Sequence, residues 1–254
     1  MNNEEIILGL DISTKCIGVC LYYFHPAKGS KILKITHFLP KVSSKISGIE
    51  KLFIKAKIFE DEFLSNIKDI NITKVIIEEP LMKSNNVNTV DVLLKFNGII
   101  SNSIYKILGI VPDYISSYDA RRYAFPELIS IRRFNKNGKK LPYEKLINLI
   151  RKNDIVLFGD YPFDCDKKLI LWNKISERYP YIEWVYGKNG ELKKENFDAS
   201  DALVTCIGYT NKIKYGEIIE GRNCFVNLAN SDDKKIINYS VKIWGKEYNK
   251  KIIL

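Results

Sequence analysis

Residues 9–21, GLDISTKCIGVCL, determine how this chain begins to fold. An apolar strand carries Asp11 in its middle, stops at a short polar segment, and resumes as a second apolar strand from Ile17. A carboxylate inside a sheet is costly unless something pairs with it. We therefore expect either a turn that exposes Asp11 or a cation that binds it.

The pattern around this stretch predicts a mixed α/β sheet. Three strands are expected over residues 6–13, 17–24 and 32–39, and their short connections make them an antiparallel meander. Helix-length segments then alternate with short apolar strands at 47–69, 74–79, 88–108 and 111–117. Helices between strands imply right-handed crossovers and parallel strands, which complete a ribonuclease H-like layout with flanking helices.

The remainder of the chain has a less regular pattern. Helices are expected at 143–152, 166–178 and 198–210. A hairpin is expected to turn at Asn189 and Gly190, between two strand-like segments. We expect a domain over residues 1–212 with an insertion at about 121–195, followed by a C-terminal extension over 213–254.

Composition narrows the classes of function. The chain has 254 residues, five cysteines without a C-x-x-C pair, and two histidines. Reduced thiols are therefore expected, and neither a histidine-based zinc site nor a serine–histidine triad is favoured. No apolar run is long enough for a bilayer, and the first residues are not a secretion signal, so we expect a soluble protein of the cytoplasm.

The net charge of +10 indicates a polyanionic partner, most often nucleic acid. Residues 121–152 contain ten Lys and Arg against two Glu, interleaved with aromatic side chains. Such a mixture is typical of phosphate contact with base stacking, and a solvated helix face explains it equally well. Contacts to DNA are predicted for Lys15, Lys83, Arg121, Arg122, Arg132, Arg133, Lys139 and Lys140.

Four carboxylates are candidates for one acidic pocket. Asp11 lies in the first strand and Glu78 ends the fourth, and these two strands are neighbours in the predicted sheet. Asp198 and Asp201 share one face of the last clear helix. Taken alone, Asp198 is explained as a helix N-cap, with Asp201 favoured by the helix dipole. The combination is more specific than any member, because order, element type and spacing agree.

Carboxylates that meet in one pocket predict a bound cation. They repel one another and are driven towards protonation unless a cation neutralises them. Oxygen ligands favour Mg²⁺ or Mn²⁺ over zinc. Two such ions about 4 Å apart can activate water on one side of a phosphodiester and stabilise the leaving oxygen on the other. We expect two Mg²⁺ ions, replaceable by Mn²⁺, and no covalent intermediate.

Three motifs resemble the RuvC-like Holliday junction resolvases and occur in that family's order. ILGLDISTKCIGVCL (7–21) resembles the first strand and hairpin, VIIEEPLMKSN (75–85) resembles the second motif, and DASDALVTCI (198–207) resembles the third. The resemblance covers residues 5 to about 120 and 196–210. It implies a Mg²⁺-dependent endonuclease that cuts branched DNA as a homodimer making paired nicks.

The resemblance also implies a role for each acidic residue. Asp11 matches the metal ligand of the first strand and would bridge the two ions. Glu78 matches the ligand of the second motif, with Glu79 as its neighbour. Asp198 and Asp201 match the paired aspartates of the third motif.

The chain departs from this family in its length and in its second motif. The interval between Glu78 and Asp198 is longer than compact members need, and the tail after residue 212 is additional. Bacterial members often have an aromatic wedge shortly after the second-motif glutamate, where this chain has Leu81 and Met82. The inserted segment is therefore expected to contact DNA differently. The divergence suggests a viral or mobile-element version, which would act in the host-cell cytoplasm.

Other functions share parts of this pattern. GLDISTKCIG also resembles the phosphate loop of sugar kinases and actin-like ATPases, but their second phosphate loop, rich in Asp and Gly, is not found in this sequence. A non-catalytic DNA-binding protein on the same fold is a third interpretation, disfavoured by carboxylates at all three motifs. A nuclease acting on flaps, single strands or RNA–DNA hybrids is a fourth.

Overall fold

The computed structural model describes residues 4–80, 86–229 and 235–254. The chain forms two compact units, one of residues 1–120 and 171–210, the other of residues 121–170 and 211–254. The domain boundary predicted after residue 212 stays a prediction, because these compact units do not test it.

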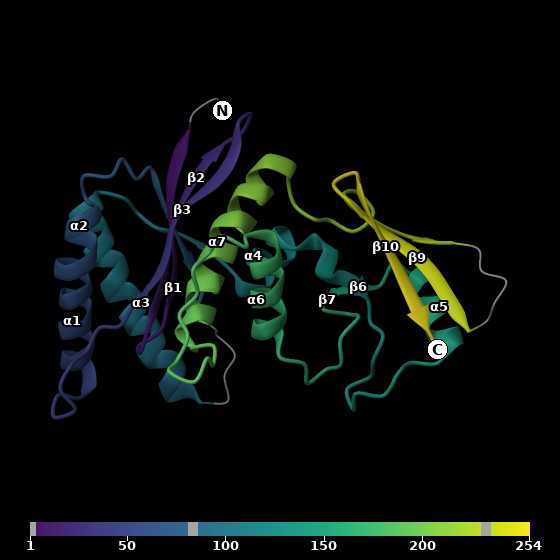
Figure 1. Cartoon of the computed structure of the whole chain (residues 1–254), viewed down its shortest axis with the longest axis horizontal. Coiled ribbons are helices and arrows are strands. Elements are labelled where there is room, and N and C mark those ends of the chain that lie inside the picture. The colour runs from purple at the N-terminus through teal and green to yellow at the C-terminus, as the bar shows by residue number, and fades with distance from the viewer. Residues whose placement is uncertain (1–3, 81–85, 230–234) are drawn as a thin grey trace. The chain divides into compact units, whose positions relative to one another are not determined.

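The first unit contains a five-stranded sheet and the helices that cover it (Figure 1). In chain order its elements are β1 (Glu5–Ile12), β2 (Ile17–His25), β3 (Gly29–Phe38), α1 (Gly48–Phe59), the π-helix η1 (Glu60–Leu64), α2 (Ser65–Ile67), β4 (Lys74–Glu78), α3 (Val87–Leu108) and β5 (Asp113–Ile115). The chain passes between units within three further helices, which are α4 (Ser117–Ala124), α6 (Lys167–Arg178) and α7 (Glu195–Tyr215).

The sheet confirms the ribonuclease H-like fold class. Its strand order is β3-β2-β1-β4-β5, in which the first three strands of the chain are antiparallel and β4 and β5 add in parallel. The turn after β1 is closed by Ser13, whose Oγ donates to the carbonyl of Cys16 at 2.8 Å and accepts from its amide at 3.1 Å. The polar break that follows Asp11 is therefore a tight turn that folds β2 back on β1.

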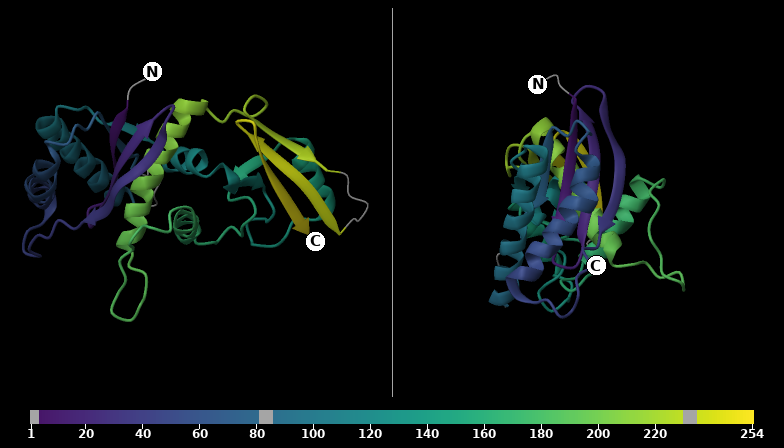
Figure 2. Two further views of the ribbon diagram at one scale, coloured as in Figure 1. Left: turned by 45° about the horizontal axis from the view of Figure 1, so that its top comes forward. Right: turned by 90° about the vertical axis from the view of Figure 1, so that its left-hand side faces the viewer.

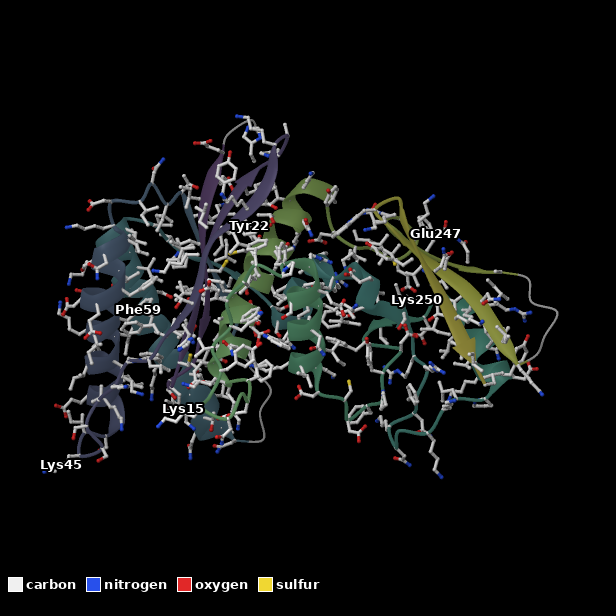
Figure 3. All side chains as sticks on the ribbon, viewed as in Figure 1. Lys15, Tyr22, Lys45, Phe59, Glu247 and Lys250 are labelled. Atoms are coloured by element: carbon white, nitrogen blue, oxygen red, sulfur yellow. The ribbon has the colours of Figure 1, made fainter. Side chains whose placement is uncertain are left out.

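One face of the sheet packs against α1, η1, α2 and α3. Leu8 and Leu10 of β1 alternate towards this side and meet Phe96 of α3 within a single apolar cluster. Phe59, at the end of α1, belongs to this apolar cluster (Figure 3). Its ring stacks on that of Phe63, with centroids 5.1 Å apart. This layer holds the strands in place and leaves their other face to α7, which runs alongside them (left panel of Figure 2).

Besides the ends of the three shared helices, the described residues of the second unit form two small antiparallel sheets, one α-helix and one short 3₁₀-helix, η2. Its elements are η2 (Pro126–Leu128), β6 (Ile129–Ile131), α5 (Tyr143–Arg151), β7 (Ile155–Leu157), β8 (Cys224–Leu228), β9 (Ile236–Ile243) and β10 (Lys246–Ile253). β6 pairs with β7, and the other three strands form a meander in the order β10-β9-β8. Ile147 of α5 and Tyr239 of β9 are both buried, so this unit has apolar residues in its interior as well.

The first long helix differs from the prediction in its last part. The expected single helix changes to a π-helical turn at Glu60–Leu64. There the buried Glu60 carboxylate pairs with Lys57 and with Lys106, each at 3.0 Å. The wider turn brings this acid between the two cations that stabilise its charge.

The last helix differs in its bounds. It begins at Glu195 and ends at Tyr215, so Asp198 lies inside the first turn. The interpretation of Asp198 as an N-cap is therefore wrong, although the favourable helix dipole still acts on it.

Among the described residues, no helix combines the length and the apolar character that crossing a bilayer needs.

Candidate functional site

Asp11 and Glu78 lie at the carboxyl ends of adjacent parallel strands. The ladder between β1 and β4 pairs Leu10 with Ile77, so Asp11 and Glu78 occupy the next step along it. Because Leu10 and Ile77 belong to the apolar cluster on one face, the two carboxylates point towards the opposite face. Glu78 is half-buried with its Oε2 atom shielded from solvent, whereas Glu79 is exposed.

The first half of α7 approaches this same face at two glycines. A Cβ atom on Gly18 would overlap the carbonyl oxygen of Asp198, and one on Gly9 would lie 2.5 Å from the carbonyl oxygen of Ala202. Only glycine lets a helix backbone come so close to a strand. Gly18 is the cross-strand partner of Asp11, so this packing brings Asp198 beside the strand position that carries Asp11.

The buried thiol of Cys16 lies among these carboxylates. Burial is the largest cause that raises the pKa of Cys16 far above its ordinary value, followed by the charge of Asp198, a hydrogen bond to Asp198, and the charges of Glu195 and Asp11. Since these charges act on one thiol, Asp11 and Asp198 lie in a common environment.

Asp201 is one turn further along α7 and is only 2% exposed. Its carbonyl oxygen accepts a hydrogen bond from Thr205 Oγ1 at 2.9 Å. The same side of the helix continues to Gly208, where an added Cβ would meet the backbone of Ala120 in α4. Asp198 therefore lies against the β1–β2 hairpin, and Asp201 lies on the side of α7 that turns towards α4.

These carboxylates are brought together in pairs. Asp11 and Glu78 end neighbouring strands, and the charges of Asp11 and Asp198 both raise the pKa of Cys16. In the part of the chain that the structure describes, no three Asp, Glu, His or Cys side chains form a group arranged to hold a metal ion. The donor types are those that a hard divalent cation prefers, since they are carboxylate oxygens.

Three lysines gather at the same end of the sheet as Asp11. Lys55 of α1 donates its ammonium hydrogen to the carbonyl of Thr14 in the β1–β2 turn. Burial, followed by the charges of Lys51 and Lys15, lowers the pKa of Lys55. Lys15 is exposed at this end (Figure 3). Sequence reasoning missed Lys51 and Lys55, whose spacing of four residues on a predicted helix was the available signal.

The predicted DNA contacts fall into different settings. Four of them are exposed, which are Lys15, Arg132, Lys139 and Lys140. Arg121 and Arg122 are half-buried on α4, where Arg122 donates to Tyr123 Oη at 3.1 Å. Arg133 donates to the carbonyl of Ile253 at 3.2 Å and so ties its loop to β10. Lys83 lies outside the described residues.

Three of the exposed predicted contacts, Arg132, Lys139 and Lys140, lie on a short hairpin, residues 132–141, which we call the basic hairpin. The amide of Asn135 donates to the carbonyl of Lys139, and that of Leu141 donates to the carbonyl of Arg133, both at 2.9 Å. Lys136 is exposed as well. No acidic residue occurs between 128 and 143, so this hairpin presents positive charge without local compensation.

The net charge of the whole chain belongs to one unit. Residues 121–170 and 211–254 contain 21 Lys and Arg against 11 Asp and Glu, whereas the other unit contains 19 of each kind. The entire formal charge of +10 therefore lies in the second unit, and the four carboxylates lie in the neutral one. Electrostatic attraction for a polyanion is therefore expected mainly from the second unit.

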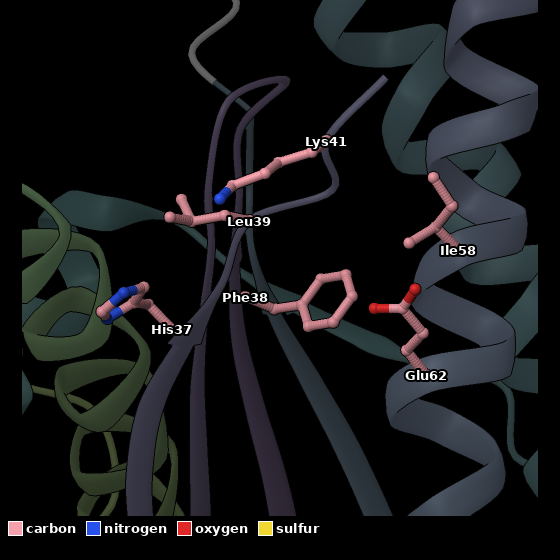
Figure 4. Close-up of a pocket in the computed structure, with 6 residues that line it drawn as sticks. All are labelled: His37, Phe38, Leu39, Lys41, Ile58 and Glu62. Atoms are coloured by element: carbon pink, nitrogen blue, oxygen red, sulfur yellow. The ribbon is translucent and has the colours of Figure 1, made fainter. Parts of the chain in front are cut away.

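Two hollows lie away from the carboxylates. One of about 450 Å³ beside the edge strand β3 is lined by His37, Phe38, Leu39, Lys41, Ile58 and Glu62 (Figure 4). The other, of about 420 Å³, lies on the β8–β10 sheet and includes three asparagine side chains. Neither of these two hollows is lined by a predicted ligand.

No family model matches this chain, and no curated protein matches its sequence. Among solved structures, the chain is similar to RuvC of Thermus thermophilus, with 11% identity, a TM-score of 0.49, and coverage of 83% of this chain and 96% of that one. The chain is also similar to T. thermophilus RuvC in complex with a Holliday junction substrate, with 10% identity, a TM-score of 0.47, and coverage of 83% of this chain and 96% of that one. For the yeast mitochondrial Holliday junction resolvase Ydc2, the identity is 10%, the TM-score is 0.46, and the coverage is 82% of this chain and 78% of that one. At such identities, function has to be argued from this chain's own residues.

Proposed function

We propose that this protein is a divalent-cation-dependent endonuclease that cleaves branched DNA, with four-way junctions as the preferred substrate. The observation that carries the proposal is the meeting of β1, β4 and the start of α7 on one face of the sheet. Asp11 and Glu78 end adjacent strands there, and Asp198 lies over the cross-strand partner of Asp11.

Each acidic residue has a role in this proposal. Asp11, Glu78, Asp198 and Asp201 would hold Mg²⁺ or Mn²⁺ through their carboxylate oxygens. The bound cations would supply activation of water and stabilisation of the leaving oxygen in phosphodiester hydrolysis. In this proposal, the rigid strands and the close packing of α7 against Gly18 would hold Asp11, Glu78 and Asp198 in place before substrate arrives.

The cationic side chains hold the polyanion in this proposal. Lys55 contacts the β1–β2 turn, and Lys51 and Lys15 lie near it; these three lysines would contact the phosphates nearest the cleaved bond. The basic hairpin would contact phosphates of the same DNA. Arg133 is assigned to positioning of that hairpin, because its guanidinium is bonded to the carbonyl of Ile253.

The assembly that we propose is a homodimer. A junction that is resolved without a gap needs two nicks, and a two-fold pair of identical sites supplies them symmetrically. Sedimentation of the protein alone and with a four-way junction tests this part, and one protomer per junction at saturation would contradict it.

The proposal is tested with four labelled substrates, which are a four-way junction, a flap, a linear duplex and an RNA–DNA hybrid, each with Mg²⁺. We expect paired nicks in the junction and little cleavage of the duplex. Asp11→Asn should abolish cleavage and leave junction binding largely intact, since binding rests on Lys and Arg.

Two results would overturn the assignment. Normal cleavage by Asp11→Asn would exclude Asp11 as a ligand. Turnover of ATP without cleavage of any DNA would favour the phosphate-loop interpretation of residues 9–18 instead.

A further inference from the structure

A hairpin precedes α7 directly, and its bounds agree with the turn predicted at Asn189 and Gly190. Tyr186 and Leu192 form its antiparallel bridge, and the amide of Gly187 donates to the carbonyl of Glu191 at 2.8 Å. We call residues 185–193 the α7 hairpin. It extends beyond the N-terminal end of α7 (left panel of Figure 2).

The α7 hairpin is fixed to its helix by a buried asparagine. Asn196, 2% exposed, donates from Nδ2 to the carbonyl of Val185 at 2.6 Å and accepts from the amide of Val185 at 3.0 Å. Beside this clamp, the ring of Trp184 meets that of Trp172 in α6 with centroids 5.8 Å apart. The base of the hairpin therefore has a defined position relative to the first turn of α7.

An aromatic side chain stands exposed immediately beyond this clamp. Tyr186 is 50% exposed, although its neighbour Val185 is held on both backbone groups by Asn196. Lys188 and Lys193 on the same hairpin are exposed. A half-exposed ring on a pre-ordered backbone, with cations nearby, is the arrangement that stacks on an unpaired base while the backbone phosphates are neutralised.

The position of the ring relates it to the candidate chemistry. Asn196 lies two residues before Asp198 on α7, which corresponds to a rise of about 3 Å along the helix. A base stacked on Tyr186 would therefore belong to the strand that enters the acidic face. In a continuous duplex such a base is paired and stacked, whereas a branch point frees it at lower cost.

We propose that Tyr186 is a stacking site for an unpaired base of branched DNA, held near the carboxylates by Asn196. The proposal rests on the proposed function and adds to it the element that distinguishes a branch from a plain duplex. The acidic residues would carry out the chemistry, and the α7 hairpin would favour substrates with an available base.

The test uses the full chain with Asp11→Asn as the parent, without divalent metal, so that binding is read without cleavage. The probe is a four-way DNA junction with 2-aminopurine at the branch point. Tyr186→Ala is compared with Tyr186→Phe, which keeps the ring. Tyr105→Ala is the matched control, since Tyr105 is 57% exposed on α3, which covers the other face of the sheet.

We expect Tyr186→Ala to lose the fluorescence change at the branch and about tenfold in junction affinity. Tyr186→Phe and Tyr105→Ala should behave as the parent, and binding to linear duplex should not change. Parent-like binding by Tyr186→Ala would overturn the proposal. An equal loss of affinity for linear duplex would overturn it too. So would a loss of affinity confined to single-stranded RNA, used as a further probe.

The two proposals fail separately. Cleavage by the unmodified protein is measured with Mg²⁺ on the same junction. If the unmodified protein cuts the junction and Tyr186→Ala binds it normally, the proposed function stands and the stacking site is refuted. If Tyr186 stacks on the base but the protein cuts no DNA, the stacking site stands and the proposed function is refuted.

Discussion

Gly18 is the residue whose replacement best tests how α7 meets the sheet. In Gly18→Ala, the new methyl group would overlap the carbonyl oxygen of Asp198 and lie 2.9 Å from the amide nitrogen of Ala199, against the 3.4 Å at which ordinary contact begins. Both neighbours are backbone atoms, so no flexible side chain can yield. The helix must move from β2 by at least about 0.5 Å, and further to clear the oxygen.

Two consequences follow for Gly18→Ala. Overpacking of this kind lowers the free energy of unfolding by about 1–3 kcal/mol. A displacement approaching 1 Å in a catalytic group costs about 100-fold in rate. Single-turnover cleavage of a four-way junction and urea unfolding followed by circular dichroism measure the two effects on one protein preparation.

Gly98→Ala is the matched control. Gly98 lies within α3, and an added Cβ there has no atom within 4 Å. Alanine in a helix interior should raise stability by about 0.5–1 kcal/mol and leave cleavage unchanged. The reasoning is refuted if Gly18→Ala cuts at the normal rate, because the approach of α7 would then not position the carboxylates.

Two further outcomes are expected. The basic hairpin has four exposed cations, which are Arg132, Lys136, Lys139 and Lys140. Replacing all four by Gln should reduce the slope of log affinity against log salt concentration by about 3–4. The control replaces four exposed lysines of the neutral unit by Gln, which are Lys28, Lys31, Lys34 and Lys45, and should change the slope little; equal changes in the two variants would remove the basic hairpin from the DNA interface. Burial, with a smaller effect of Glu220, raises the pKa of Cys224 from 9.0 to about 11, so the protonated thiol stabilises the fold below pH 9.0 and this contribution is lost as pH rises towards about 11. Urea unfolding of Cys224→Ala across that range should show a weaker pH dependence than the unmodified protein, and identical curves would contradict the assignment.

The sheet of the first unit could be predicted because its signals are local. Short polar breaks between apolar runs require antiparallel strands, and a helix between two strands requires a crossover. The pairing of Asp11 with Gly18 follows from the tight turn at Ser13, since register in a hairpin is set by its turn.

The β9–β10 hairpin was missed because its turn is unusual. Trp244 and Gly245 both have positive φ, 51° and 80°, and tryptophan is not a residue that normally indicates such a turn. Its ring stacks on Tyr215 and Tyr123 with centroids 5.2 and 6.0 Å apart. These tertiary contacts stabilise a backbone conformation that the local sequence disfavours.

The amino-acid sequence by itself determined the strand order, the identity of the acidic candidates and the overall positive charge, because each depends on residue type and spacing along the chain. Tertiary structure alone decided that α7 rests on Gly9 and Gly18, and that the positive charge gathers in a unit separate from the carboxylates. Both are outcomes of packing between segments far apart in sequence, and no local pattern specifies which surface a helix will meet or which distant segments will share a core.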